Sequence, residues 1–254
     1  MTKLREHRGK ALRRGSSSFP GDARYRSLAM QMESLSSSLN SLGALITPGT
    51  SISKAVASLG SQGGTILLSE GEWSFFETLT ISRPNVHIVA TSPSRTKFTR
   101  SAGGATNMIV LDGVGCMLEG IRFVDPNVAA GAVKITADRC SVKNCTFEDV
   151  GGGVHVTDAD WTEITGNHII KMAYSGIVFD GTCAYWIVAN NRFEGSNASY
   201  NDILMRASVT SAVIAGNVFE YSNGEIDIVG HASMQTQAEL LATNSIDNAN
   251  IQVR

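Results

Sequence analysis

The chain has 254 residues, of which 43% are hydrophobic and 17% charged, with 25 Gly and only 5 Pro. That length suffices for one elongated domain with an appendage. No run of 18 apolar residues occurs, so no membrane-spanning helix is expected. The N-terminus is basic but has no apolar segment behind it, so we expect no cleaved signal peptide.

Positive charge is concentrated in residues 1–26, although the net charge of the whole chain is −2. This arm holds eight Lys/Arg and two acidic residues, a net charge of +6, which leaves −8 on the remainder. A basic arm binds nucleic acid or an acidic protein surface. A Gly/Ser stretch in its middle predicts that it becomes ordered only on a partner. The residues assigned to anchoring are Arg5, Arg8, Lys10, Arg13 and Arg14.

Apolar residues then recur at alternating spacings of three and four through the segment 27–47. This a/d pattern predicts a helix that forms a short coiled coil. Its outer positions are mainly Ser, Asn and Gln, so a single amphipathic helix lying on the following domain is the alternative. Self-association is favoured because so short a helix is unstable alone, and a trimer is expected by analogy with other elongated β-helices. The seam residues are Tyr25, Leu28, Met32, Leu35, Leu39, Leu42 and Ile46.

The remaining segment, residues 48–254, begins with an amphipathic helix expected at residues 51–59. Ile52, Val56 and Leu59 lie on one face of this helix, and Gly60 ends it. A helix directly before the first coil of a solenoid would cover an apolar end that is otherwise exposed.

A segment with apolar residues at its first and sixth positions recurs from residue 118 to residue 246, with starts 22–27 residues apart. A fixed period of this size with β-rich units is the signature of a solenoid. The last four copies carry an asparagine two residues before their final apolar residue. Stacked in register, such amides can donate and accept hydrogen bonds along the coils, so we predict a structural ladder. Its members are Asn167, Asn191, Asn217 and Asn244.

Three-residue strands recur at the same period, from 108–110 to 251–253, and most alternate apolar, variable, apolar. Coils stacked about 4.8 Å apart would pair each strand with the coil above and the coil below. We therefore predict an all-β fold, a right-handed, single-stranded parallel β-helix. An antiparallel sandwich is the alternative, but it gives no reason for Asn to return at one phase of the cycle.

Residues 50–254 resemble the pectate-lyase-like superfamily of parallel β-helices. The resemblance lies in the helix at 55–59, the Gly-Gly-Thr segment at 63–73, the strand at 79–81 and the Pro-Asn-Val turn at 84–89. It implies the fold but no single activity, since the superfamily spans lyases, hydrolases, epimerases and non-catalytic phage tail proteins.

Enzymes of that superfamily act on polysaccharides with carboxylates, or with basic residues and Ca²⁺, on the outer face of one strand ladder. The corresponding outward residues are Lys134, His155, Val178, Leu204 and Asp227. Val178 and Leu204, the apolar pair in the middle, form a poor binding surface for a sugar acid. Asp180 and Asp202 are the catalytic candidates, whereas Asp158 and Asp160 follow a strand as turn residues do. The five histidines show no metal-ligand spacing, so no metal and no cofactor is expected.

Cysteines and aromatic residues each leave two readings open. Cys116 and Cys140 would lie on adjacent coils, a spacing compatible with a disulfide, although small apolar fillers in a reduced compartment are favoured. The aromatic residues near turns form either a carbohydrate platform or corner packing. They are Trp161, Tyr174, Tyr185, Trp186, Tyr200 and Tyr221.

The order of basic arm, heptad and β-helix resembles phage tailspikes, whose N-terminal anchor precedes a trimeric β-helix. The leading hypothesis is a structural virion protein, a short spike or fibre subunit made in the host cytoplasm. Its expected partners are itself as a homotrimer, other virion proteins through the arm, and host-surface polysaccharide. The alternative is a polysaccharide lyase or glycoside hydrolase acting on capsule or envelope sugars. A third class is a nucleic-acid-binding protein that works through the arm.

Overall fold

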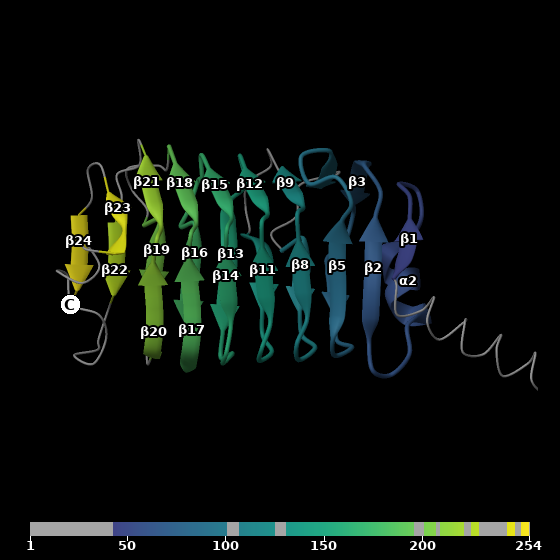
Figure 1. The fold of residues 1–254 in the computed structure, drawn as a ribbon, viewed down its shortest axis with the longest axis horizontal. Coiled ribbons are helices and arrows are strands. Elements are labelled where there is room, and N and C mark those ends of the chain that lie inside the picture. Colours follow the sequence, from purple (N-terminus) through teal and green to yellow (C-terminus); the bar gives the residue numbers. More distant parts are fainter. Residues whose placement is uncertain are drawn as a thin grey trace, which may run out of the picture. The chain divides into compact units, whose positions relative to one another are not determined.

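The coils form three parallel β-sheets of eight strands each in a computed structural model (Figure 1). It describes residues 43–100, 107–124, 131–195, 201–206, 209–220, 225–228, 243–246 and 250–253. Every pairing between named strands is parallel, and each strand except the two outermost of every sheet pairs with its equivalents one coil before and one coil after it. The predicted all-β parallel β-helix is therefore confirmed.

The chain visits the three sheets in a fixed order, which we name A, B and C. Sheet A contains β1 (Ala44–Ile46), β2 (Gly64–Leu68), β5 (Val86–Ala90), β8 (Met117–Glu119), β11 (Ser141–Lys143), β14 (Glu163–Thr165), β17 (Cys183–Ala189) and β20 (Val209–Ala215). Sheet B contains β3 (Gly71–Phe75), β6 (Thr96–Arg100), β9 (Arg122–Val124), β12 (Thr146–Glu148), β15 (His168–Ile170), β18 (Arg192–Glu194), β21 (Val218–Glu220) and β23 (Ser245–Ile246). Sheet C contains β4 (Leu79–Ile81), β7 (Ile109–Leu111), β10 (Gly131–Ile135), β13 (Gly152–Thr157), β16 (Ile177–Asp180), β19 (Ile203–Met205), β22 (Glu225–Ile228) and β24 (Asn250–Val253).

The core consists of apolar side chains that stack on their equivalents in neighbouring coils. Inner positions alternate with outer ones along most of the described strands, as in β5 and β15. Behind sheet B, the rings of Phe123 and Phe147 stack with centroids 4.9 Å apart, and those of Phe193 and Phe219 with centroids 4.8 Å apart. Neighbouring coils and stacked aromatic rings are separated by nearly the same distance, so an aromatic residue in one coil favours another at the equivalent position of the next coil.

The corner between sheets A and B is held by the asparagine ladder. Asn191 shows the pattern: its Oδ1 accepts the backbone N–H of Asn167 at 2.9 Å, and its Nδ2 donates to the carbonyl of Ile164 at 2.9 Å and to Oδ1 of Asn217 at 3.1 Å. The same contacts recur along the stack from Asn167 to Asn244. Each amide thus satisfies backbone groups that the sharp corner leaves out of the sheets.

The residue directly before Asn167, Asn191 and Asn217, and before the equivalent positions in the two preceding coils, has a positive φ, which explains the amino acids found there. Gly and Asn tolerate this left-handed conformation better than other residues do. These residues are Gly120, Asn144, Gly166, Asn190 and Gly216, with φ between 52° and 71°. The corner therefore repeats with the same backbone shape in these five successive coils.

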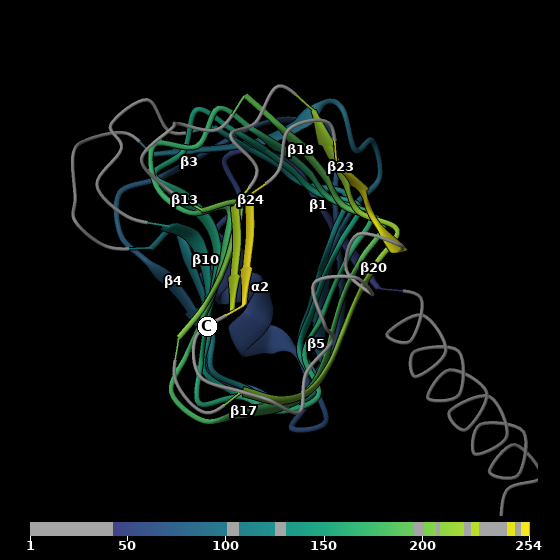
Figure 2. The same ribbon diagram turned by 90° about the vertical axis from the view of Figure 1, so that its left-hand side faces the viewer.

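Helix α2 (Ile52–Ser58) closes the N-terminal end of the core, where an amphipathic helix was expected. The Ser51 side chain caps it by accepting the backbone N–H of Lys54, and Ile52 and Val56 are buried in the core cluster. Viewed along the stack, α2 lies within the outline of the three sheets (Figure 2). No helix in the described ranges is long and apolar enough to span a bilayer.

The coiled-coil segment expected at 27–47 is wrong at its C-terminal end. Residues Ala44–Ile46 form β1, which pairs in parallel with β2. Gly43, with a φ of +90°, is incompatible with a continuing helix, and β1 pairs an edge of sheet A that would otherwise be open. Ile46 is therefore not part of a helical seam. The seam positions from Tyr25 to Leu42, and the basic arm, lie outside the described residues.

Replacing Asn191 with Ala should lower the free energy of unfolding by about 2–4 kcal/mol, because a backbone N–H and a carbonyl would stay buried without partners. Urea denaturation followed by circular dichroism measures the change. The matched control is Asn190→Gly at the neighbouring, left-handed position, where we expect less than about 1 kcal/mol. Equal losses in the two variants would contradict a structural role for the inward amides.

Candidate functional site

The outer face of sheet C carries a groove of about 250 Å³. Its lining comes from β10, β13 and β16, from Tyr174 and Ser175, and from Arg206 directly after β19. Glycines form part of the lining, so the strands there carry no side chains that would fill the groove. A Cβ atom at Gly153 would lie 2.4 Å from the carbonyl oxygen of Gly176, so only glycine fits at that position.

A histidine and an aspartate from successive coils meet in this groove. Nε2 of His155, on β13, lies 2.6 Å from Oδ2 of Asp180, on β16. The pairing of β13 with β16 explains the contact, because Thr157 lies opposite Asp180 and His155 is two residues before Thr157 on the same face. Both side chains remain about one-third exposed, at 36% and 26%. The carboxylate orients the imidazole while leaving it accessible to a ligand.

Two cations flank this pair without carboxylate partners of their own. Lys134 lies opposite His155 on the preceding coil, and Arg206 follows Met205, which lies opposite the neighbour of Asp180. Neither side chain makes an ion pair or hydrogen bond with any residue in the described ranges. The groove itself therefore contains Asp180, His155 and Arg206, and Lys134 lies beside it on the preceding coil.

The structure places one of the two sequence-derived catalytic candidates in the groove. Asp180 faces it, whereas Asp202 is only 1% exposed and lies within the coil. Asp158 and Asp160 act as turn residues, since they accept the backbone N–H groups of Thr182 and Ala184 at 2.8 and 2.7 Å. The candidates thus do not assemble into a pair of exposed carboxylates.

His155 was identified from the sequence as an outward residue, but not as the partner of Asp180. Arg206 was missed altogether. Its signal in the sequence is its position two residues after Leu204, which matches the position of Asp180 two residues after Val178. Reading both outward positions of each strand, instead of the central one alone, would have placed these side chains next to one another.

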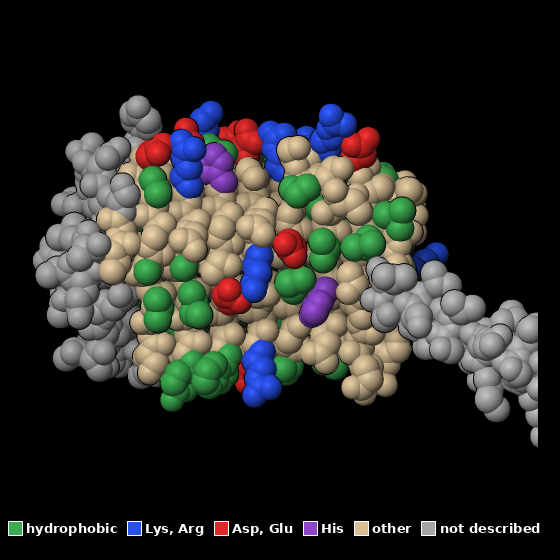
Figure 3. Space-filling view, in the orientation of Figure 1, with side chains coloured by type: hydrophobic (Ala, Val, Ile, Leu, Met, Phe, Trp, Pro, Cys, Tyr) green, Lys and Arg blue, Asp and Glu red, His purple; other side chains and the backbone are tan. Residues whose placement is uncertain are grey.

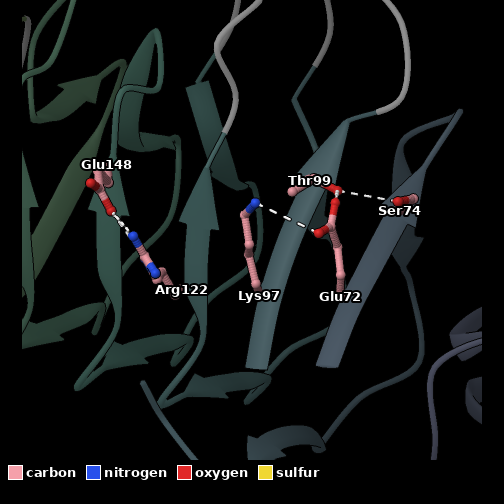
Figure 4. Close-up of polar contacts among 6 residues, drawn as sticks. All are labelled: Glu72, Ser74, Lys97, Thr99, Arg122 and Glu148. Carbon is pink, nitrogen blue, oxygen red and sulfur yellow. Dashed lines mark hydrogen bonds and ion pairs between the residues drawn. The ribbon is translucent and has the colours of Figure 1, made fainter. Parts of the chain in front are cut away.

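Sheet B carries a different charged surface, in which cations are paired with carboxylates of neighbouring coils. Lys97 lies 3.7 Å from Glu72, and Arg122 pairs with Glu148 (Figure 4). His168 lies 3.0 Å from Glu194 on the next coil. Figure 3 shows a row of blue and red side chains along the upper edge, where Figure 1 shows the strands of sheet B. Exposed ion pairs contribute about 0–1 kcal/mol each. Charge on sheet B is therefore largely compensated, unlike that around the sheet C groove.

The aromatic residues near the turns divide between three environments. Trp161 and Tyr185 are exposed and stack on each other, with ring centroids 4.4 Å apart and planes inclined by 13°. Each ring covers one face of the other, so the two do not form a flat platform for a sugar. Trp186 is buried against Phe179, and Tyr174 lines the groove. Tyr200 and Tyr221 lie outside the described residues.

Residues 86–253 match the family model described as periplasmic copper-binding protein (NosD). No curated protein matched the sequence.

Among solved structures, the catalytic domain of a GH87 α-1,3-glucanase in complex with nigerose is 14% identical, with a TM-score of 0.56 over 82% of this chain and 45% of that one. Pectin methylesterase PemA from Erwinia chrysanthemi is 16% identical, with a TM-score of 0.50 over 83% and 80%. Geobacillus virus E2 ORF18 is 11% identical, with a TM-score of 0.49 over 91% and 63%. The glucanase and the methylesterase share the β-helical fold with this chain. The similarity to the viral protein is too low to support an argument. The chain spans less than half of the glucanase domain.

A methyl group on the groove floor should be poorly tolerated. We expect Gly153→Ala to lower the free energy of unfolding by about 1–3 kcal/mol, because the added Cβ collides with the backbone of the next coil. The control is Gly60→Ala, whose added Cβ would meet no atom within 4 Å. Thermal unfolding of both variants measures the difference. A Gly153→Ala variant as stable as Gly60→Ala would show that the backbone around Gly153 can shift to accommodate the added methyl group.

Proposed function

The chain belongs to the NosD family, and on this β-helical scaffold we propose that it serves as a structural virion protein of a phage. It is a short spike or fibre subunit that projects a right-handed parallel β-helix from the particle. Residues 1–26 anchor it to other virion proteins, and the heptad segment joins three copies. The sheet C groove attaches the spike to an acidic glycan of the host surface.

The anchoring and trimeric parts of this proposal rest on the sequence. The arm carries a net charge of +6, which suits an acidic docking surface on another virion protein. The heptad retains six seam positions, from Tyr25 to Leu42, once Ile46 is assigned to β1. A stack of coils linked by backbone hydrogen bonds and by buried amides forms a stiff support for a surface held away from its anchor.

The glycan-binding part rests on one observation: Lys134 and Arg206, which have no carboxylate partners among the described residues, lie beside the His155–Asp180 pair. An anionic ligand would supply the missing countercharge. The guanidinium of Arg206 can bind a carboxylate with two parallel hydrogen bonds, whereas Lys134 offers a point charge. His155 and Asp180 offer a donor and an acceptor for sugar hydroxyl groups. A carboxylate-bearing saccharide matches this combination better than a neutral one.

The alternative function, a polysaccharide lyase or glycoside hydrolase, finds less support in the same groove. Glycoside hydrolysis generally needs two carboxyl groups on either side of the bond that is cleaved. Asp180 faces the groove, but Asp202 is buried. A single carboxylate held by a histidine suits binding better than this two-carboxylate reaction.

Copper, which the family description names, does not fit the residues that the structure describes. Copper sites in proteins use convergent Cys, Met or His ligands. No three His, Cys, Asp or Glu side chains converge in the described ranges. His155 and His168 lie on different sheets, and each is already paired with a carboxylate. The proposal therefore includes no copper.

Binding of the intact protein to immobilised polygalacturonate, hyaluronate and neutral dextran tests the glycan-binding role. We expect binding to at least one acidic polymer, none to dextran, and a steep loss of binding with added salt. Replacing both Lys134 and Arg206 with Ala should weaken binding at least tenfold. The control is Arg192→Ala, which removes a paired cation of sheet B and should leave binding unchanged.

Release of reducing ends or unsaturated products from the same polymers would instead support the enzymatic alternative, provided that Asp180→Ala abolishes the release. Equal binding by the wild type, the double variant and the Arg192→Ala variant would show that the groove is not the attachment site.

The trimer is tested by the sedimentation mass of the intact chain. We expect the mass of three copies for the wild type and of one copy for a Leu35→Asp/Leu39→Asp variant, because charges at seam positions repel one another across the helices. Ser37→Asp, at an outer position of the heptad, should remain trimeric. A single-copy mass for the wild type would refute self-association through this segment.

A further inference from the structure

Two cysteines on adjacent coils meet in the core just after the corner between sheets C and A. Cys116 precedes β8 and Cys140 precedes β11, and both are fully buried. The strands pair with Met117 opposite Ser141, so the two cysteines occupy equivalent positions of successive coils. They are therefore direct neighbours along the stack, at inward-facing positions.

Both thiols also make contacts with backbone carbonyls inside the core. Sγ of Cys116 donates to the carbonyl of Arg83 at 3.2 Å, and Sγ of Cys140 donates to that of Gly113 at 3.3 Å. In-register parallel neighbours lie about 4.8 Å apart, within the range of roughly 4.4–6.8 Å that a disulfide requires between Cα atoms.

The two sulfur atoms are chemically unequal. The neighbouring Cys140 side chain lowers the pKa of Cys116 to about 7, and Cys116 in turn raises the pKa of Cys140. Cys116 is thus the thiol of the pair that ionises more readily, and the thiolate is the form that attacks oxidants. By contrast, burial raises the pKa of Cys145 to about 12 and also raises that of Cys183. Cys116 is the most nucleophilic of the four cysteines.

We propose that Cys116 and Cys140 form a reversible disulfide between successive coils when the protein encounters a peroxide. The Cys116 thiolate attacks one peroxide oxygen, the O–O bond breaks, and a sulfenic acid and hydroxide result. The sulfur of Cys140 then attacks the sulfur of Cys116 and displaces its hydroxyl group. The thiol proton of Cys140 converts the displaced hydroxide to water, and the proton that Cys116 lost on ionising converts the hydroxide of the first step. Overall, two thiols are oxidised to one disulfide while one hydrogen peroxide is reduced to two waters.

The bond would fasten one complete coil. It closes the loop from Cys116 to Cys140, so these residues could no longer separate when the stack opens at this boundary. Solenoid stability is largely a sum of contacts between neighbouring repeats, and the bond strengthens one of them covalently. Loop closure of this size predicts a rise in the unfolding temperature of about 5–10 °C. The thiols would stay reduced in a cytoplasm and react in oxidising surroundings.

The test uses the full chain, reduced, freed of reductant and exposed to increasing hydrogen peroxide. Thiols are counted in denaturant, and linked peptides are identified by mass spectrometry after non-reducing digestion. We expect two of the four thiols to disappear, a mass loss of two hydrogen atoms, and one linked pair containing residues 116 and 140. A phosphine reductant should restore both thiols and lower the unfolding temperature again.

Matched variants separate this pair from the other buried thiols. Cys140→Ser should form no linkage and should instead gain oxygen at Cys116, because the sulfenic acid formed there has no second thiol to react with, whereas Cys183→Ser should still lose two thiols to the linked pair. Circular dichroism checks that both variants fold. If either variant fails to fold, the linked peptides of the wild type still decide the outcome. The proposal is overturned if, in the wild type, all four thiols survive, if oxygen adds to single cysteines without a linkage, or if a different pair or two chains become linked.

Discussion

In-register stacking of parallel coils is the constraint on which the rest of the structure depends. Because every strand except the two outermost of each sheet pairs with its equivalents before and after it, each side chain has its own counterpart as nearest neighbour along the stack. Residues that attract their own kind are therefore repeated. Phenylalanines stack behind sheet B, and asparagine amides bond to one another at the corner between sheets A and B. The same rule brings Cys116 onto Cys140 in the core.

Outside the core, in-register stacking brings the charged side chains of equivalent positions close to one another. Identical charges at equivalent positions would repel one another, so sheet B alternates cations and carboxylates and pairs them between coils. Sheet C departs from this arrangement near the groove, where Lys134 and Arg206 have no carboxylate partners among the described residues. A local departure from the compensation seen elsewhere on the same solenoid is the physical basis for the proposed ligand contact.

The segment before the first complete coil shows where periodicity misleads. Ile46 continues a 3-4 spacing that extends back to Tyr25, and this spacing predicts a helix. The structure instead uses Ala44–Ile46 as a strand, because the edge of β2 offers backbone hydrogen bonds that a helix could not use. A three-residue stretch fits either pattern, and only the neighbouring strand decides between them.

The sequence by itself determined the coil. The period of 22–27 residues, the asparagines at one phase, the alternating strands and the amphipathic helix before them all follow from local spacing, so the fold could be predicted from them. The period also aligns equivalent outward positions, but it does not give the contacts within the groove. His155 meets Asp180 across 25 residues, and Arg206 reaches the same groove from a third coil. The sequence interval does not say which side chains reach across to the next coil and which are buried within their own coil. Tertiary structure decided this by fixing the register of each coil on the next, and thereby exposed Asp180 and buried Asp202.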